Sequence, residues 1–185
     1  MKTIGVMCYQ GAGHLHTNAL KKLGFDALSI YAGIDFFQTD GLILPGGESS
    51  VQYSYCLNNG LDKKILEYSL TKKPILGTCA GAILLSQYSS EKIKGFGLIN
   101  VQMIKNFYGR QIKSTTVRSD KNNEITLIRA PAIVDLGDQV TILDTYQEKP
   151  TFIKQNNIHI TTFHPELGKL NQENILYKIF AMSNK

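Results

Sequence analysis

The stretch ILGTCAGAILLSQY, residues 75–88, predicts the fold because it joins a buried strand to a helix through a single turn. Residues 75–78 are apolar or small, and Lys73-Pro74 in front of them breaks the preceding helical pattern. Residues 80–88 have the pattern of a helix. Cys79 lies at the turn between strand and helix. A strand–turn–helix unit of this kind is typical of α/β proteins with a parallel sheet.

The residues before this unit repeat the same alternation. Apolar strand patterns at 2–9, 25–31 and 41–45 alternate with helical patterns at 14–23, 50–57 and 61–71. Since strand and helix follow each other in this way, we expect βαβ units on a mostly parallel central sheet flanked by helices.

The second half of the chain changes character, because strand patterns follow one another with little helix between them. They cover residues 98–104, 112–118, 125–129, 139–144, 151–155 and 158–163. Asn156-Asn157 suits a tight hairpin turn, and a last helix is predicted over 171–182. The chain has no evident linker or repeat. We therefore expect one α/β domain over residues 1–185, with antiparallel strands in its second half.

Composition narrows the classes of function. The net charge is +5, but the lysines are scattered in pairs, which disfavours nucleic-acid binding. Apolar runs too short for a bilayer, and an N-terminus without signal-peptide features, predict a cytoplasmic protein. Three cysteines without a CxxC pair predict neither a disulfide framework nor a metal site. His14 and His16 lie two apart on a predicted helix, so their side chains point apart, and we expect no metal there.

Cys79 is the strongest candidate for a catalytic residue. Its position between strand and helix follows the logic of the nucleophile elbow, with cysteine in place of serine. The N-terminus of the following helix favours the thiolate, and the backbone N–H of Ala80 is placed to receive an oxyanion. The alternative is a structural cysteine beside a helix that packs through glycines.

A cysteine nucleophile needs a base, and the base needs a group that orients it. His164-Pro165-Glu166 offers both, because residues two apart in extended backbone project to the same side. Pro165 also keeps His164 out of the helical region. Glu166 can then hold the imidazole of His164 in one tautomer. The alternative is a surface turn with an incidental histidine.

A third element, Pro45-Gly46-Gly47-Glu48-Ser49, directly follows a predicted strand. A glycine pair at the carboxyl end of a parallel strand exposes backbone N–H groups to a ligand. Gly47 could give a second oxyanion donor, while Glu48 and Ser49 offer polar contacts to a small charged substrate. On its own, a glycine pair after a strand is most often only a turn.

In this order the three elements resemble the class I (triad) glutamine amidotransferases, whose shared fold is a flavodoxin-like α/β sheet with helices on both sides. Longer matches narrow the resemblance to the glutaminase subunits of pyridoxal 5'-phosphate synthase, the PdxT family. They are IGVMCYQGAGHLH, DGLILPGGESS, GTCAG, GLINV, NFYGRQ, LIRAP and TFHPEL. These segments run from Ile4 to Leu167, nearly the whole chain.

The resemblance implies roles for the matching residues. Cys79 would be the nucleophile, His164 the base and Glu166 its orienting group. The implied glutamine contacts and oxyanion hole are Gly46, Gly47, Glu48, Ser49, Ala80, Lys105, Ile128 and Arg129. Lys105 stands where the family usually has arginine, so the charge is kept and the planar fork is lost. His14-Leu15 replaces the family's usual Arg-Glu in a region associated with partner contact.

The implied reaction is hydrolysis of L-glutamine to L-glutamate and ammonia through a thioester, without a cofactor. The implied partner is the (β/α)8-barrel subunit of pyridoxal 5'-phosphate synthase, which would receive the ammonia for vitamin B6 biosynthesis in a hetero-oligomer. One alternative is a glutaminase subunit of another pathway, such as histidine biosynthesis. A more distant one is a DJ-1-like protein, although that class lacks the PGGES and His-Pro-Glu segments.

Overall fold

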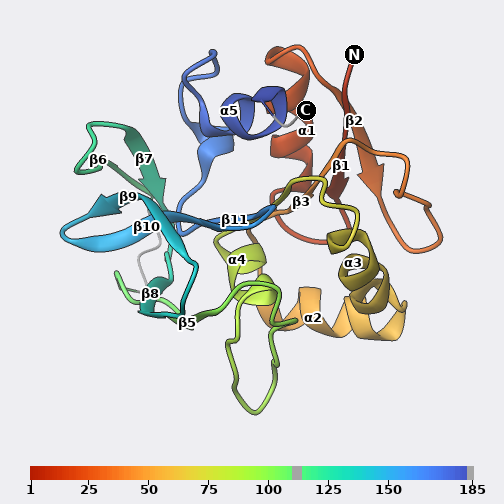
Figure 1. The fold of residues 1–185 in the computed structure, drawn as a ribbon, viewed down its shortest axis with the longest axis horizontal. Coiled ribbons are helices and arrows are strands. Elements are labelled where there is room, and N and C mark those ends of the chain that lie inside the picture. Colours follow the sequence, from red (N-terminus) through yellow and green to blue (C-terminus); the bar gives the residue numbers. More distant parts are fainter. Residues whose placement is uncertain (110–113, 183–185) are drawn as a thin grey trace.

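The computed structural model describes residues 1–109 and 114–182. Its centre is a seven-stranded sheet in the order β2-β1-β3-β4-β11-β10-β9 (Figure 1). The strands are β1 (Thr3–Met7), β2 (Asp26–Ile30), β3 (Gly41–Leu44), β4 (Ile75–Thr78), β9 (Thr141–Tyr146), β10 (Lys149–Gln155) and β11 (Ile158–Thr161). The first five strands in the sheet order are parallel, and β10 is antiparallel to both of its neighbours. The predicted α/β class, with a mostly parallel sheet and later antiparallel strands, is confirmed.

Helices cover both faces of the sheet (Figure 1). On one face lie α1 (Gly13–Lys22) and α5 (Ile175–Met182), and on the other lie α2 (Ser49–Asn58), α3 (Leu61–Ser69) and α4 (Ala80–Leu85). The strand β3 shows why the central strands are uniformly apolar. Ile43 packs into the core under α1 and α5, whereas Leu42 and Leu44 pack into the opposite core. A parallel strand buried on both faces needs apolar residues at every position.

Two small antiparallel sheets flank the main one. β5 (Val101–Ile104) pairs with β8 (Ala132–Leu136), and β6 (Thr115–Arg118) pairs with β7 (Glu124–Leu127). The sequence patterns did not predict β8. The predicted strand at 112–118 is found from Thr115 onward, and residues 112–113 lie outside the described part of the chain. A hairpin between β10 and β11 confirms the turn predicted at Asn156-Asn157.

Three predicted helices are shorter than their sequence patterns: α3 ends two residues early, at Ser69, and α4 and α5 differ more. α4 ends at Leu85 because the following loop returns and takes over its last carbonyls: Phe96 N–H donates to Leu84 at 2.7 Å and Leu98 N–H donates to Leu85 at 2.9 Å. The last helix, predicted from residue 171, starts only at Ile175. The Asn174 side chain accepts a hydrogen bond from the N–H of Leu176 at 2.9 Å, which caps this helix start.

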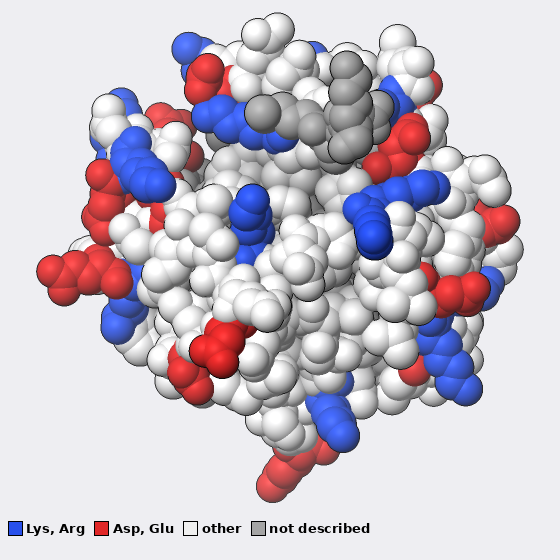
Figure 2. Space-filling view, viewed as in Figure 1, with Lys and Arg blue, Asp and Glu red and all other residues white. Residues whose placement is uncertain are grey.

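The surface shows no single basic face in the view of Figure 2, where Lys and Arg side chains are scattered among Asp and Glu. This distribution fits the scattered lysine pairs of the sequence. Within residues 1–109 and 114–182, every helix falls short of the length and apolar character that crossing a membrane requires.

Candidate active site

The site lies where four parallel strands end at the same edge of the sheet. Tyr9 to Ala12 follow β1, Pro45 to Glu48 follow β3, Cys79 follows β4, and Thr162 to His164 follow β11. β4 and β11 are neighbours in register, with Thr78 opposite Thr161. Because their ends are level, the next residues of both strands emerge side by side. Ligands of open α/β sheets bind at this carboxyl edge.

Cys79 occupies a strained turn between β4 and α4. Its φ is +48° and its ψ −102°, a conformation that residues with a side chain rarely adopt. Its N–H donates to Thr161 O at 2.9 Å, and Sγ lies 3.9 Å from Ile128 O. Such strain persists only where the surroundings enforce it, and it is common at functional sites. The elbow geometry expected from the sequence is present.

The glycines beside Cys79 allow the helix to approach the sheet. A Cβ on Gly77 would lie 2.7 Å from the carbonyl oxygen of Gly81, and a Cβ on Gly81 would collide with the backbone of Leu44. Both contacts are too short for any side chain. The two glycines of the Gly-Thr-Cys-Ala-Gly pattern therefore permit the close packing of α4 around the turn that holds Cys79.

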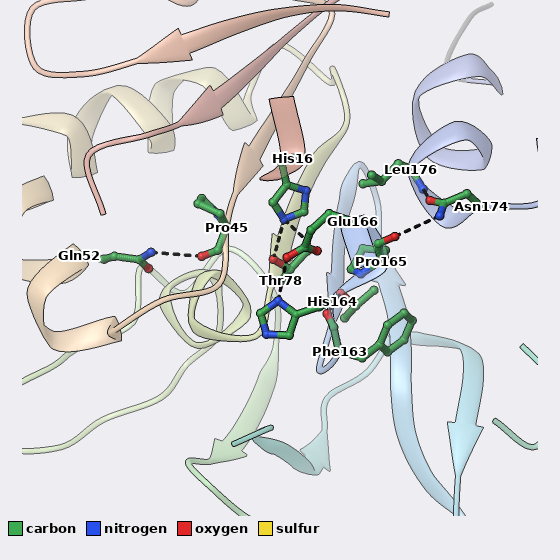
Figure 3. Close-up of polar contacts among 11 residues, drawn as sticks. His16, Pro45, Gln52, Thr78, Phe163, His164, Pro165, Glu166, Asn174 and Leu176 are labelled. Carbon is green, nitrogen blue, oxygen red and sulfur yellow. Dashed lines mark hydrogen bonds and ion pairs between the residues drawn. The ribbon is translucent and has the colours of Figure 1, made fainter. Parts of the chain in front are cut away.

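His164 and Glu166 form a buried pair. Their side chains are joined by a hydrogen bond of 2.7 Å between Nδ1 of His164 and Oε1 of Glu166 (Figure 3). The backbone differs from the extended geometry expected from the sequence, because Pro165–Leu167 form a short 3-10 helix. That turn still brings the carboxylate of Glu166 back to the imidazole of His164.

The protonation of this pair is set by its contacts. Burial favours the neutral imidazole of His164, but hydrogen bonds and charge from Cys79 and Glu166 outweigh it and raise the pKa of His164 to about 10. Burial likewise opposes the carboxylate of Glu166, yet interactions with His16 and His164 hold its pKa below the usual value. The arrangement therefore favours an imidazolium next to Cys79.

The loop after β3 borders the imidazole. A Cβ on Gly46 would collide with Cε1 of His164, and a Cβ on Gly47 would collide with the side chain of Gln10. The Gln10 Oε1 also accepts the N–H of Glu48 at 3.0 Å. Gln52 donates to the Pro45 carbonyl at 3.2 Å from the other side (Figure 3). The sequence did not single out the two glutamines that brace this loop.

Three further predicted contacts surround the opening. Lys105 Nζ lies 3.3 Å from Oε1 of Glu48, an ion pair between partly exposed side chains. Despite some burial, hydrogen bonds from Ser50 and Lys105 keep the pKa of Glu48 below its usual value. Ile128 and Arg129 follow β7, and the exposed Arg129 has a φ of +44°.

A pocket of about 200 Å³ joins these elements. Of the residues that the sequence proposed, all except Glu166, which lies behind His164, line it: Gly46, Gly47, Glu48, Ser49, Cys79, Ala80, Lys105, Ile128, Arg129 and His164. Ala12, Ile83, Asn106 and Pro131 complete the lining. Pockets for drug-sized ligands are about 300–1,000 Å³, so this one suits a small metabolite. The Ser49 hydroxyl is buried and lacks a hydrogen-bond partner within the described residues.

The sequence also missed a histidine of this site. His16 on α1 is fully buried and its Nε2 lies 3.2 Å from Oε2 of Glu166 (Figure 3). His14 on the same helix is exposed, so the two side chains do point apart, as expected. His16 could have been identified from the sequence by its position between Gly13 and Ala19, on the side of the helix that is buried.

The chain is similar to known glutamine amidotransferases over most of its length. The sequence profile of the SNO glutamine amidotransferase family matches residues 6–183. The pyridoxal 5'-phosphate synthase subunit PdxT of Caldicellulosiruptor saccharolyticus is 40% identical over 179 residues, covering 92% of this chain and 94% of the relative. That of Thermotoga maritima is 39% identical over 175 residues, covering 89% and 91%. A crystal structure of a glutamine amidotransferase superposes with a TM-score of 0.82 at 28% identity, covering 89% of this chain and 90% of that one.

Proposed function

The chain belongs to the SNO glutamine amidotransferase family, and from that premise we propose that Cys79, His164 and Glu166 hydrolyse glutamine for a pyridoxal 5'-phosphate synthase. The chain is the glutaminase subunit of this synthase, as its sequence resemblance to the PdxT family predicted. The observation that carries the proposed chemistry is one pocket in which a strained cysteine faces a histidine held by a buried carboxylate.

The first half of the reaction forms a thioester. The thiol proton of Cys79 passes to His164, and the sulfur attacks the side-chain amide carbon of glutamine. The carbon–nitrogen bond breaks as the nitrogen takes a proton from His164 and leaves as ammonia. The raised pKa of His164 supports this role, because it keeps the imidazolium available as the acid.

The second half releases glutamate. His164, now neutral, removes a proton from water, and the resulting hydroxide attacks the thioester carbon. The carbon–sulfur bond breaks, and Cys79 is ready for another cycle. Backbone N–H groups near Gly47 and at Ala80 stabilise the oxyanion in both halves, and loss of one such donor typically costs about 10²–10³ in rate.

The rim of the pocket supplies charges that suit a free amino acid. Arg129 can hold the α-carboxylate with two hydrogen bonds, and Glu48 can hold the α-ammonium. Lys105, which pairs with Glu48, keeps that carboxylate in place. The unpartnered hydroxyl of Ser49 and the backbone of Ile128 complete the contacts that we assign to glutamine.

The ammonia is used by a second protein. We propose that it passes into a (β/α)8-barrel synthase subunit bound to this chain in a hetero-oligomer. We also propose that residues 1–185 act as one glutaminase domain, without a cofactor, in the cytoplasm.

The test is glutamate release from glutamine by the wild type and by Cys79→Ala, each with and without the cognate synthase subunit. We expect activity that rises with the synthase and disappears in Cys79→Ala. Glutaminase activity that is indifferent to the synthase would refute the proposed partner. Absence of any activity that depends on Cys79 would refute the proposed mechanism.

A further inference from the structure

A second histidine lies behind the proposed catalytic pair. His16 of α1 is fully buried, as are Thr78 of β4 and the side chain of Glu166. The Nε2 of His16 lies 3.2 Å from Oγ1 of Thr78 and 3.2 Å from Oε2 of Glu166 (Figure 3). The other carboxylate oxygen, Oε1, is the one that binds His164. Glu166 is thus held between two imidazole rings.

The contacts of His16 determine which of its ring nitrogens carries the proton. A bare Nε2 would place a lone pair 3.2 Å from the carboxylate oxygen Oε2 of Glu166, which is repulsive. The Nδ1 is buried and has no hydrogen-bond partner within the described residues, so a proton there would be an unpaired buried donor. The favoured form is therefore a neutral ring with its proton on Nε2. That N–H is better aligned with Thr78, and its positive end also faces Oε2 of Glu166.

The surroundings support the neutral form. Burial lowers the pKa of His16, and the titratable groups facing it within the described residues are Glu166 and His164. A doubly protonated His16 would add a charge next to an imidazolium. With His16 neutral, the single negative charge of Glu166 is left to balance the charge of His164.

The helix that carries His16 is held firmly against the site. A Cβ on Gly13 would lie 2.7 Å from the carbonyl oxygen of Met7, so the start of α1 packs directly on the end of β1. The N–H of Ala12 donates to Gly46 O at 2.9 Å. The position of His16 is therefore fixed relative to both the β3 loop and the 3-10 helix of Glu166.

We propose that His16 is a positioning residue for the glutaminase reaction: its neutral Nε2–H, shared with Thr78, keeps Glu166 turned so that Oε1 stays on Nδ1 of His164. The proposal rests on the function assigned above, because it acts through the His164–Glu166 pair. Glu166 Oε2 accepts no hydrogen bond from the described residues, so without the N–H that lies 3.2 Å away the carboxylate is free to turn away from His164.

The first test is steady-state kinetics at saturating synthase. His16→Leu keeps the bulk and removes the donor, whereas His16→Gln returns an N–H near the position of Nε2. We expect His16→Leu to lower kcat about 10–100-fold with little change in KM, as is typical when the partner that orients an active-site group is removed. His16→Gln should recover most of the loss. Lys21→Leu, an exposed change in the last turn of the same helix, should retain the wild-type kcat.

Recovery of activity in His16→Gln would separate a positioning role of His16 from a role in packing alone. If His16→Gln is as impaired as His16→Leu while both remain folded by circular dichroism, the N–H is not what matters and the proposal is overturned. A wild-type kcat in His16→Leu would also overturn it. Cys79→Ala is run in parallel: if the wild type itself shows no activity that depends on Cys79, the proposed function fails rather than the role of His16.

The second test uses NMR to locate the proton on the His16 ring. In the chain labelled with ¹⁵N-histidine, variants assign the signals of the four histidines. We expect His16 to remain a neutral Nε2–H ring from pH 6 to pH 8, and the titration of His164 to move to lower pH in His16→Leu but not in His16→Gln. A proton on Nδ1 of His16, or a titration of His164 that is unchanged in His16→Leu, would contradict the proposal.

Discussion

Adding one methyl group at Gly46 should strongly slow catalysis while leaving the fold intact. In the structure, a Cβ on Gly46 collides with Cε1 of His164 and lies 3.2 Å and 3.3 Å from the two ring nitrogens. Non-bonded carbon atoms prefer separations of about 3.5–4.0 Å, so the imidazole must move by roughly 1 Å. A misplacement of about 1 Å can cost 10²-fold in rate. We therefore expect Gly46→Ala to lower kcat for glutamate release about 100-fold.

The control is another glycine-to-alanine substitution, close to the His164–Glu166 pair. At Gly168, the nearest atom to an added Cβ is the Pro165 carbonyl oxygen at 3.5 Å, an ordinary contact. Gly168→Ala should therefore keep wild-type activity. Overpacking typically costs about 1–3 kcal/mol, and each kcal/mol lowers the Tm of a protein of this size by about 2–4 °C, so Gly46→Ala remains folded at 25 °C. A folded Gly46→Ala with wild-type kcat would show that His164 does not sit against this loop.

Three other changes test separate contacts. Glu166→Gln removes the charge that favours the imidazolium, so the pKa of His164 should fall from about 10, and an NMR titration that keeps its midpoint would contradict the pairing. Lys105→Ala breaks a partly exposed ion pair with Glu48, so urea unfolding should show a loss of only about 0–1 kcal/mol, while KM for glutamine rises; an unchanged KM would remove Lys105 from the substrate site. Gly81→Ala forces a Cβ into the Leu44 backbone, so it should lower the free energy of unfolding by about 1–3 kcal/mol or more, and a stability equal to wild type would refute the close packing of α4 on β3.

The antiparallel half of the fold shows where sequence patterns fail. The turn between β9 and β10 consists of Gln147 and Glu148, both with positive φ, at 50° and 63°. Hairpin turns of this type normally contain Asn or Gly, so the sequence carries no visible signal for it. The strand β8 was missed as well. Its exposed positions include Val134 and Asp135, and the strand gains its hydrogen bonds from β5, which lies far away in sequence.

The local chemistry and the class of fold could be predicted from the sequence. Alternating strand and helix patterns predict a parallel sheet, and each of the three site motifs follows a predicted strand. The glycines of Gly-Thr-Cys-Ala-Gly predict a close turn, which the structure has at Cys79. These signals are local, because they depend on the backbone preferences and polarity of neighbouring residues.

Which of these residues lie in contact depends on the three-dimensional fold. Cys79 and His164 lie together because β4 and β11 are adjacent and in register, an arrangement that depends on how the whole sheet buries its two faces. The same packing places His16 against Glu166, although nothing near His16 in the sequence refers to that carboxylate. Contacts between distant side chains follow from strand order and helix packing, and those are properties of the assembled core rather than of any one segment.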